Sequence, residues 1–194
     1  NDNSRSASFA DITSAQVIYS STMDIIPGWH DAQIKGDHNR ANLAAAIAAT
    51  TRFEIPEATV SKAVRSFVGV PYRLQLIGQK HGVKYINDTC ATTPDATLAA
   101  LATMKGPIIL ILGGSDKSLM FEDLGKQIHA LGSQIRLIIL LPGEGTARLQ
   151  LTLPNGLLRE VSSMKEAVDL AAAEAQTGDS VLLSPACASF GLFD

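Results

Sequence analysis

Stretches of strand length and stretches of helical pattern alternate along the chain after about residue 70. Apolar residues concentrate at 74–78, 83–87, 108–112, 135–141 and 181–183, whereas helical patterns occupy 94–104, 121–131 and 163–176. Alternation of this kind is typical of a mostly parallel sheet that carries helices on both faces. The predicted fold class of this region is therefore α/β, with a Rossmann-like, doubly wound sheet.

The first two predicted strands form an exception to the parallel arrangement. Only the four residues QKHG, at 79–82, separate them. A parallel crossover needs about a dozen residues or more, whereas an antiparallel pair can be joined by a tight turn. We therefore expect a hairpin at one edge of the sheet.

The part of the chain before residue 70 has a helical pattern instead. The segment DHNRANLAAAIAAT is rich in alanine, which has the highest intrinsic helix propensity. The segment IPEATVSKAVRSF then places Pro56 in a first helical turn, where its missing N–H is not needed. We expect a small helical domain at residues 1–69, followed by a complete α/β domain at residues 70–194.

Composition and charge argue against several classes of protein. With a net charge of −3, the chain offers no electrostatic reason to bind nucleic acid or an anionic membrane. The apolar runs at 108–112 and 137–141 are far shorter than the roughly 18 residues that a transmembrane helix needs. The expectation is a soluble protein without a nucleic-acid or membrane partner.

The two cysteines, Cys90 and Cys187, lie far apart in the sequence and form no CxxC motif. This spacing is poor for a zinc site or a disulfide scaffold, and it favours a reducing, cytoplasmic setting. The polar segment NDNSRSASFADITSA at the start lacks the basic-then-apolar order of a signal peptide. We interpret residue 1 as an internal point of a longer chain.

Four loops follow the carboxyl ends of predicted strands, where ligands bind in open α/β sheets. Their sequences are NDTCATT, GGSDKS, PGEGTAR and SPACAS. Glycines, hydroxyls and charged side chains gather in these loops, so the chemistry of the protein is expected there.

Two of the loops imitate known phosphate-binding motifs without matching them. In GGSDKS, Asp116 stands where a phosphate loop requires glycine, although the two glycines and Lys117 still suit an anion. An exposed loop lysine explains that sequence equally well. In PGEGTAR, Arg148 stands where a dinucleotide fingerprint requires glycine or alanine, so we interpret this segment as a turn.

The other two loops contain hydroxyl groups and a cysteine each. A helix after SPACAS would place Ser189 at its N-terminus, which suits a carboxylate or phosphate, but a helix cap with small-residue packing explains the sequence slightly better. Thr92 or Thr93 can cap the helix that follows NDTC. Near Cys90 the local sequence offers only Asp88, whose negative charge disfavours a thiolate, so we do not interpret Cys90 as a nucleophile.

Taken together and in order, five segments resemble the Mur ligase family. They are GDHNRAN, VPYR, YINDTCATTPDAT, ILGGSDKSLMF and LLSPACASFGLF, and the resemblance runs from about Ala32 to the end of the chain. It is strongest to the branch of the family that joins D-glutamate to UDP-N-acetylmuramoyl-L-alanine in peptidoglycan synthesis. The resemblance implies an ATP-dependent ligase of three domains that forms an acyl phosphate and then an amide.

The resemblance also implies which part of such a ligase this chain represents. Residues 1–69 match the end of the central ATP-binding domain, and residues 70–194 match the C-terminal amino-acid-binding domain without its last helix. The cofactors implied are ATP and Mg²⁺, whose main phosphate and metal ligands lie outside this chain. The fragment is therefore expected to be inactive alone, and the resemblance implies a monomeric, cytoplasmic enzyme.

Eight residues match binding positions of the family, and none matches a catalytic or metal-ligating position. For ATP, Asn39 and Asn42 match contacts to the adenine side, and Arg73 and Asp88 match contacts made across the domain cleft. For D-glutamate, the matching positions that hold or line its carboxylates are Thr92, Lys117, Ser189 and Phe190. Cys90 is a departure, because many members of this branch have lysine there.

Two other interpretations remain open. The chain could belong to another Mur-type ligase or a relative of folylpolyglutamate synthase that adds a different amino acid. Alternatively, it could be a non-catalytic, Rossmann-like binding module that has kept the fold and lost the chemistry.

Overall fold

The computed structural model describes residues 7–115 and 118–189. The chain divides into two compact units, Asn1–Gly69 and Val70–Asp194. No helix in the described residues is long and apolar enough to cross a lipid bilayer.

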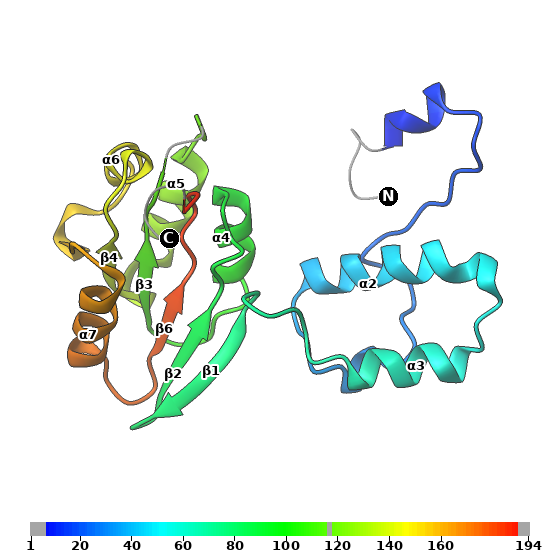
Figure 1. The fold of residues 1–194 in the computed structure, drawn as a ribbon, viewed down its shortest axis with the longest axis horizontal. Coiled ribbons are helices and arrows are strands. Elements are labelled where there is room, and N and C mark those ends of the chain that lie inside the picture. The colour runs from blue at the N-terminus through cyan, green and yellow to red at the C-terminus, as the bar shows by residue number, and fades with distance from the viewer. Residues whose placement is uncertain (1–6, 116–117, 190–194) are drawn as a thin grey trace. The chain divides into compact units, whose positions relative to one another are not determined.

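The second unit contains a six-stranded sheet with the strand order β1-β2-β6-β3-β4-β5 (Figure 1). The strands are β1 (Gln75–Lys80), β2 (Val83–Asn87), β3 (Ile108–Leu112), β4 (Ile135–Leu140), β5 (Leu158–Glu160) and β6 (Ser180–Leu183). β1 pairs with β2 antiparallel, and all other neighbouring strands are parallel. The predicted mostly parallel sheet with a hairpin at one edge is confirmed.

The hairpin turn is tighter than the sequence suggested. β1 continues to Lys80, so only His81 and Gly82 connect it to β2. Both residues have positive φ angles, 51° and 76°. A two-residue type I′ turn needs this backbone conformation at both central positions, because its twist matches that of the flanking strands.

Within residues 70–115 and 118–189, four α-helices cover the two faces of the sheet (Figure 1). They are α4 (Pro94–Leu101), α5 (Glu122–Leu131), α6 (Glu144–Gln150) and α7 (Met164–Glu174), with short 3-10 turns at Gly132–Gln134 and Asn155–Leu157. Residues of α4, α5 and α6 pack in one apolar cluster, and residues of α7 pack in another. The doubly wound arrangement is therefore confirmed.

The central strand β3 shows how the sequence produces these layers. Ile108, Leu110 and Leu112 belong to the cluster of α4, α5 and α6, and Ile109 and Ile111 belong to the cluster of α7. All five side chains are at most 1% exposed. A parallel strand with both faces covered reads as a continuous apolar run. Each such side chain contributes about 1.5–3 kcal/mol through burial.

Two elements were not predicted from the sequence. PGEGTAR was interpreted as a turn, and this was wrong beyond its first two residues, because α6 begins at Glu144. The helix has only seven residues and contains a glycine, so its intrinsic helical tendency is low. β5 has three residues, which is too short for an alternating pattern. Both α6 and β5 therefore depend on contacts with neighbouring elements more than on their local sequence.

From Ser8 to Gly69, the described part of the first unit contains two α-helices and three short 3-10 turns. The helices are α2 (Asp37–Thr50) and α3 (Glu57–Ser66), and the turns are Ser8–Ile12, Trp29–Asp31 and Thr51–Phe53. Their buried side chains form a small apolar cluster of Ile26, Ala32, Ala44 and Val64. The two helices expected before residue 70 are thus present.

Candidate functional site

A cavity of about 170 Å³ lies at the carboxyl ends of the strands in the second unit. Its walls come from the loops after β2, β3, β4 and β6 and from the first residue of α7. The lining residues are Thr89, Thr92, Gly113, Leu141, Met164, Pro185, Cys187, Ala188 and Ser189. Three of the four loops in which the sequence placed the chemistry therefore line one cavity, and PGEGTAR is adjacent through Leu141, the residue directly before it.

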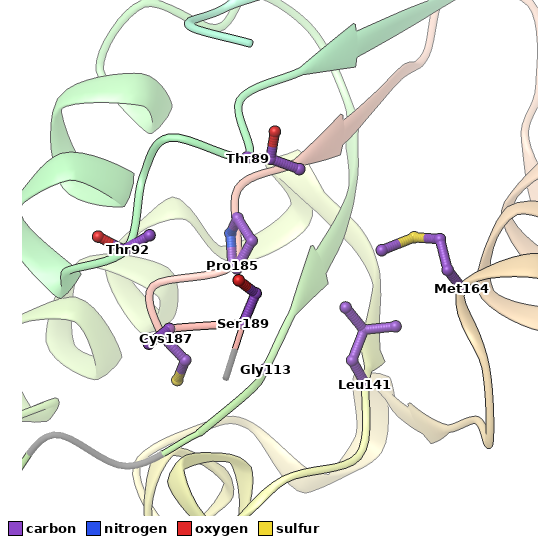
Figure 2. Close-up of a pocket in the computed structure, with 9 residues that line it drawn as sticks. Thr89, Thr92, Gly113, Leu141, Met164, Pro185, Cys187 and Ser189 are labelled. Carbon is purple, nitrogen blue, oxygen red and sulfur yellow. The ribbon is translucent and has the colours of Figure 1, made fainter. Parts of the chain in front are cut away.

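The arrangement of the walls is visible in the close-up. Figure 2 shows Thr92 on one side of the cavity, near the start of α4, and Met164 and Leu141 on the opposite side. The loop that carries Pro185, Cys187 and Ser189 runs between them. One wall thus presents a hydroxyl group and the other presents apolar side chains.

Glycines allow the loops to approach one another this closely. Gly114 and Gly143 have φ angles of 145° and 146°, which L side chains rarely adopt. A Cβ atom at Gly114 would collide with the carbonyl oxygen of Ala188, and one at Gly143 would collide with that of Gly114. The backbones of the three loops are therefore packed directly against each other.

Hydrogen bonds between loop backbones fix this packing. The Gly113 N–H donates to the Pro185 oxygen at 2.9 Å, and the Ser115 N–H donates to the Ala188 oxygen at 2.8 Å. Ser115 and Ala188 form an isolated antiparallel bridge. The loop after β6 is thus held along the loop after β3, and this places Ser189 at the edge of the cavity.

Thr146 in α6 ties the other pair of loops together. Its Oγ1 accepts a hydrogen bond from the Gly114 N–H at 2.9 Å and donates to the Leu141 oxygen at 2.7 Å. Thr146 is buried, with 7% of its surface exposed. Without this hydroxyl, both backbone groups would lose a partner inside the domain.

The structure brings together two of the four residues that the resemblance assigned to the amino acid. Thr93 caps α4, since its Oγ1 accepts from the Ala96 N–H at 3.4 Å. Thr92 is therefore not the cap, and it lines the cavity with Ser189. Lys117 and Phe190 lie outside the described residues.

Asp88, one of the residues assigned to the nucleotide, is buried inside the second unit. It is 6% exposed, and its carboxylate accepts hydrogen bonds from the Leu74 N–H at 3.1 Å and from Ser184 Oγ at 2.8 Å. Arg73, also assigned to the nucleotide, is exposed in the turn before β1. Neither residue lines the cavity.

The two asparagines assigned to the adenine side belong to the first unit. Asn39 and Asn42 lie three positions apart in α2 and so share one face of that helix. Asn39 Nδ2 donates to the Lys35 oxygen at 2.8 Å, while Asn42 is exposed.

The two cysteines have different surroundings. Cys187 is 1% exposed and lines the cavity. Cys90 is half-buried and does not line it, and its N–H donates to the Tyr72 oxygen at 3.1 Å. The interpretation of Cys90 as a non-nucleophilic residue stays a prediction.

Several residues of the site were missed in the sequence. Leu141 and Met164 supply the apolar wall and belong to no recognisable motif. Thr146, which organises two loops, lies in PGEGTAR, a segment that was interpreted only as a turn. The position of Leu141 directly after a buried strand was the only available signal.

The described residues do not form a metal site. Across residues 7–115 and 118–189, no group of three or more histidine, cysteine, aspartate or glutamate side chains could hold a metal ion. The described residues therefore offer no such ligand group to the Mg²⁺ ion that the family implies.

Comparison with known proteins identifies close sequence relatives. UDP-N-acetylmuramoylalanine–D-glutamate ligase of Roseiflexus sp. (strain RS-1) is 42% identical over 168 residues, which cover 84% of this chain and 35% of the relative. The ligase of the same name from Lachnospira eligens is 38% identical over 168 residues, covering 85% and 36%. The chain thus spans about a third of the length of these relatives.

Solved structures with similar folds are more distant in sequence. UDP-N-acetylmuramate-alanine ligase MurC from Thermotoga maritima has a TM-score of 0.63 at 19% identity, covering 80% of this chain and 36% of that one. A pseudomurein peptide ligase type C from Methanothermus fervidus has a TM-score of 0.63 at 22% identity, covering 78% and 34%. At these identities the likeness shows the fold.

A protein-family model also matches most of the second unit. The model described as Mur ligase, glutamate ligase domain, matches residues 72–187, which is more than half of the 194 residues. The matched region contains β1 to β6 and seven of the nine residues that line the cavity, and it ends before Ala188 and Ser189. The chain therefore belongs to the Mur ligase family.

Proposed function

We propose that this chain is the amino-acid-binding part of an ATP-dependent ligase that joins D-glutamate to UDP-N-acetylmuramoyl-L-alanine in peptidoglycan synthesis. The observation that carries the proposal is that Thr92 and Ser189 line one cavity at the carboxyl edge of the sheet. The relatives at 36–42% identity, which are named as ligases of this kind, support it.

The size and lining of the cavity suit a small amino acid. Its volume of about 170 Å³ is below the roughly 300–1,000 Å³ of pockets for drug-sized ligands. Hydroxyl groups donate strong, charge-assisted hydrogen bonds to carboxylates, and Thr92 and Ser189 provide two of them. Leu141 and Met164 would contact the methylene groups of the side chain. Lys117 and Phe190 complete the proposed set.

The proposed chemistry places the amine of D-glutamate as the nucleophile. ATP transfers its γ-phosphoryl group to the carboxylate of UDP-N-acetylmuramoyl-L-alanine, and ADP leaves. The neutral amine then attacks the acyl carbon, the bond from this carbon to the phosphate oxygen breaks, and the proton lost from the amine nitrogen goes to phosphate or water. The residues of the cavity hold the two carboxylates of D-glutamate, so its amine stays available for the attack. Their contribution is the positioning of the reactant, which can lower the barrier substantially without proton transfer.

The nucleotide side of the proposal involves residues of both units. Asn39 and Asn42 are assigned to the adenine and Arg73 and Asp88 to the rest of the nucleotide. The phosphate-binding and metal-binding groups for ATP and Mg²⁺ are assigned to the remaining two thirds of the relatives' length. We expect the chain by itself to be inactive as a ligase.

The two units are proposed to be parts of different domains. Residues 1–69 would be the end of the central ATP-binding domain, and residues 70–194 would be the amino-acid-binding domain. The segment 68–71 would serve as the hinge that lets the second domain deliver its amino acid. The intact protein is proposed to act as a cytoplasmic monomer.

Titration of the ¹⁵N-labelled chain with D-glutamate, followed by NMR, tests the proposal. We expect amide shifts at Thr92 and Ser189, and weaker or no shifts with L-glutamate or D-alanine as controls. T92V, which keeps the shape of the side chain and removes the hydroxyl, should weaken D-glutamate binding. Shifts that miss the loops around the cavity would count against this assignment.

A panel of amino acids given to the intact ligase separates the alternatives. Preferential use of D-glutamate supports the proposal, whereas preference for another amino acid indicates a different ligase of the family. If no amino acid is used and none binds, the chain is a binding module without ligase chemistry.

A further inference from the structure

The buried carboxylate of Asp88 joins two loops that have separate roles in the proposed function. Its Oδ1 accepts a hydrogen bond from the Leu74 N–H, and its Oδ2 accepts one from Ser184 Oγ. Leu74 directly follows Arg73, and Ser184 directly precedes the loop that lines the cavity. One side chain thus holds an end of each loop.

The turn that carries Arg73 depends on such support. Tyr72 and Leu74, on either side of Arg73, have φ angles of 65° and 45°. Residues other than glycine rarely adopt this left-handed conformation, and it persists where surrounding contacts determine it. Two of the hydrogen bonds that hold this turn come from the segment after β2, because the Leu74 N–H donates to Asp88 and the Tyr72 oxygen accepts from the Cys90 N–H. Two others are local, from the Tyr72 N–H to Gln75 Oε1 at 3.0 Å and from the Arg73 N–H to the Val70 oxygen at 3.2 Å.

The hydroxyl of Ser184 is directed by a fully buried network. Ser184 Oγ lies 2.8 Å from Asp88 Oδ2 and 3.0 Å from Thr97 Oγ1, and Thr97 Oγ1 donates to the Ser184 oxygen at 3.1 Å. Ser184 and Thr97 are both 0% exposed. A hydrogen bond to a carboxylate is stronger than one to a neutral hydroxyl, so the Ser184 proton goes to Asp88.

We propose that Ser184 and Asp88 form a link that couples the cavity to the turn carrying Arg73. Ser184 acts as a positioning residue, because it does not line the cavity and instead holds the Asp88 carboxylate under the Leu74 N–H. A ligand that shifts the loop after β6 shifts Ser184 and, through Asp88, the Arg73 turn. The identities of the coupled ligands, D-glutamate in the cavity and a nucleotide at Arg73, rest on the proposed function.

Coupling of this kind is reciprocal. If the amino acid changes the affinity for the nucleotide by some factor, the nucleotide changes the affinity for the amino acid by the same factor. The sign of the coupling is proposed to be positive, because the acyl transfer requires both sites to be occupied at the same time.

The link is tested first without ligand, by amide hydrogen exchange of the 194-residue chain. S184A removes the donor to Asp88, and T97V removes another fully buried hydroxyl of the same network but keeps the Ser184–Asp88 bond. S184A loses the hydrogen bond to the charged Asp88 carboxylate, so we expect exchange of the Leu74 amide hydrogen to be roughly tenfold faster than in the wild type. In T97V we expect the exchange rate at Leu74 to stay close to that of the wild type.

Equal acceleration in the two variants, or none in S184A, would overturn the link. S184C, whose thiol is a weak donor of similar shape, provides the same comparison if S184A lowers the stability of the whole unit. This measurement does not depend on which ligand the cavity takes.

Titration with D-glutamate then separates this inference from the proposed function. We expect shifts at Thr92, Ser189 and Leu74 in the wild type and T97V, and at only the first two in S184A. Shifts at Thr92 and Ser189 without a shift at Leu74 in the wild type would overturn the coupling and leave the proposed function standing. Absence of shifts at the cavity would overturn the proposed function, and the exchange comparison would still decide the link.

Kinetics of the intact ligase provide a readout that simple destabilisation does not change. S184A should raise the KM for both D-glutamate and ATP with little change in kcat, whereas T97V should leave both KM values near the wild type. A purely structural role predicts fewer active molecules, and therefore a lower kcat with unchanged KM values, which would contradict the coupling.

Discussion

Thr146 Oγ1 lies 2.9 Å from the Gly114 nitrogen, and this pair joins the first turn of α6 to the loop after β3. The same hydroxyl donates to the Leu141 oxygen, so one buried side chain serves the backbone of two loops around the cavity. These two hydrogen bonds come from a side chain, so they are additional to the backbone hydrogen bonds of the sheet. The geometry of the cavity therefore depends on side-chain hydrogen bonds as well as on the sheet.

Replacing Thr146 with valine tests this dependence. T146V keeps the shape of the side chain but leaves the Gly114 N–H and the Leu141 oxygen without this partner inside the domain. We expect a loss of about 1–3 kcal/mol in the free energy of unfolding, measured by urea denaturation. T146S, which keeps the hydroxyl, should recover most of the loss. Equal losses in the two variants would show that the methyl group matters more than the hydrogen bonds.

A Cβ atom at Gly143 should be strongly destabilising. The residue has a φ angle of 146°, and a Cβ there would collide with the backbone of Gly114. We expect G143A to lower the free energy of unfolding, measured by urea denaturation, by roughly 3 kcal/mol or more and to disorder the loops around the cavity. G156A is the matched control, because a Cβ at Gly156 would meet no atom within 4 Å. Its effect should stay within about 0.5 kcal/mol, as for an ordinary surface position.

The ion pair between Arg136 and Asp179 should matter more than the exposed pairs. Asp179 is 1% exposed, and Arg136 Nε lies 2.7 Å from its Oδ2. This Nε contact is not an aligned hydrogen bond, whereas Arg136 Nη2 donates to Oδ1 at 3.2 Å. R136M removes the positively charged partner of the buried Asp179 carboxylate. It should lower the free energy of unfolding by about 3 kcal/mol, measured by thermal or urea denaturation.

The exposed pair Lys165–Asp169 is the control for that measurement. Both side chains are largely in solvent, at 85% and 64% exposed. K165M should change stability by no more than about 1 kcal/mol, because water and salt screen such pairs. If K165M and R136M lowered the free energy of unfolding by similar amounts, burial of Asp179 would not be the reason that its ion pair matters.

Acid should weaken the start of α7 through Glu166. The N–H and the hydroxyl of Ser162 both donate to Glu166 Oε2 at 2.7 Å, and these bonds lower the pKa of Glu166 from its ordinary value of 4.5. A carboxyl whose pKa is lower in the folded state stabilises the fold above its unfolded pKa. That stabilisation is lost as the pH falls below about 4.5 and through the folded value.

Thermal melts of the wild type and E166Q between about pH 6 and pH 3 measure this contribution. The melting temperatures should differ most at pH 6 and converge as the pH falls. S162A keeps the N–H donor and removes the hydroxyl, so its profile should lie between the other two. A gap between the wild type and E166Q that does not narrow in acid would contradict the assignment.

Much of the fold could be predicted because its signals are local. The buried strands β3 and β4 have continuous apolar sequences, and Thr93 followed by Pro94 marks the start of α4. The hairpin followed from the short connection between β1 and β2. α6 could not be predicted, because a seven-residue helix with a glycine forms only through its packing against the loop at Gly114.

The site was predicted in part for a similar reason. The sequence indicated the four loops, and the resemblance selected Thr92 and Ser189 within them. The apolar wall of Leu141 and Met164 was not predicted, because Leu141 follows β4, Met164 begins α7, and no spacing in the sequence relates them. Asp88 was assigned to the nucleotide by the family resemblance, and its bonds to Leu74 and Ser184 became visible only in the structure.

The sequence by itself determined the layered α/β fold and the edge of the sheet where a ligand would bind. Hydrophobic periodicity and turn chemistry act over a few residues, so they can be deduced without coordinates. Only the tertiary structure decided which side chains meet at that edge. Those contacts join residues up to 96 positions apart, as Ser184 and Asp88 are, and depend on how closely glycine-containing loops can pack.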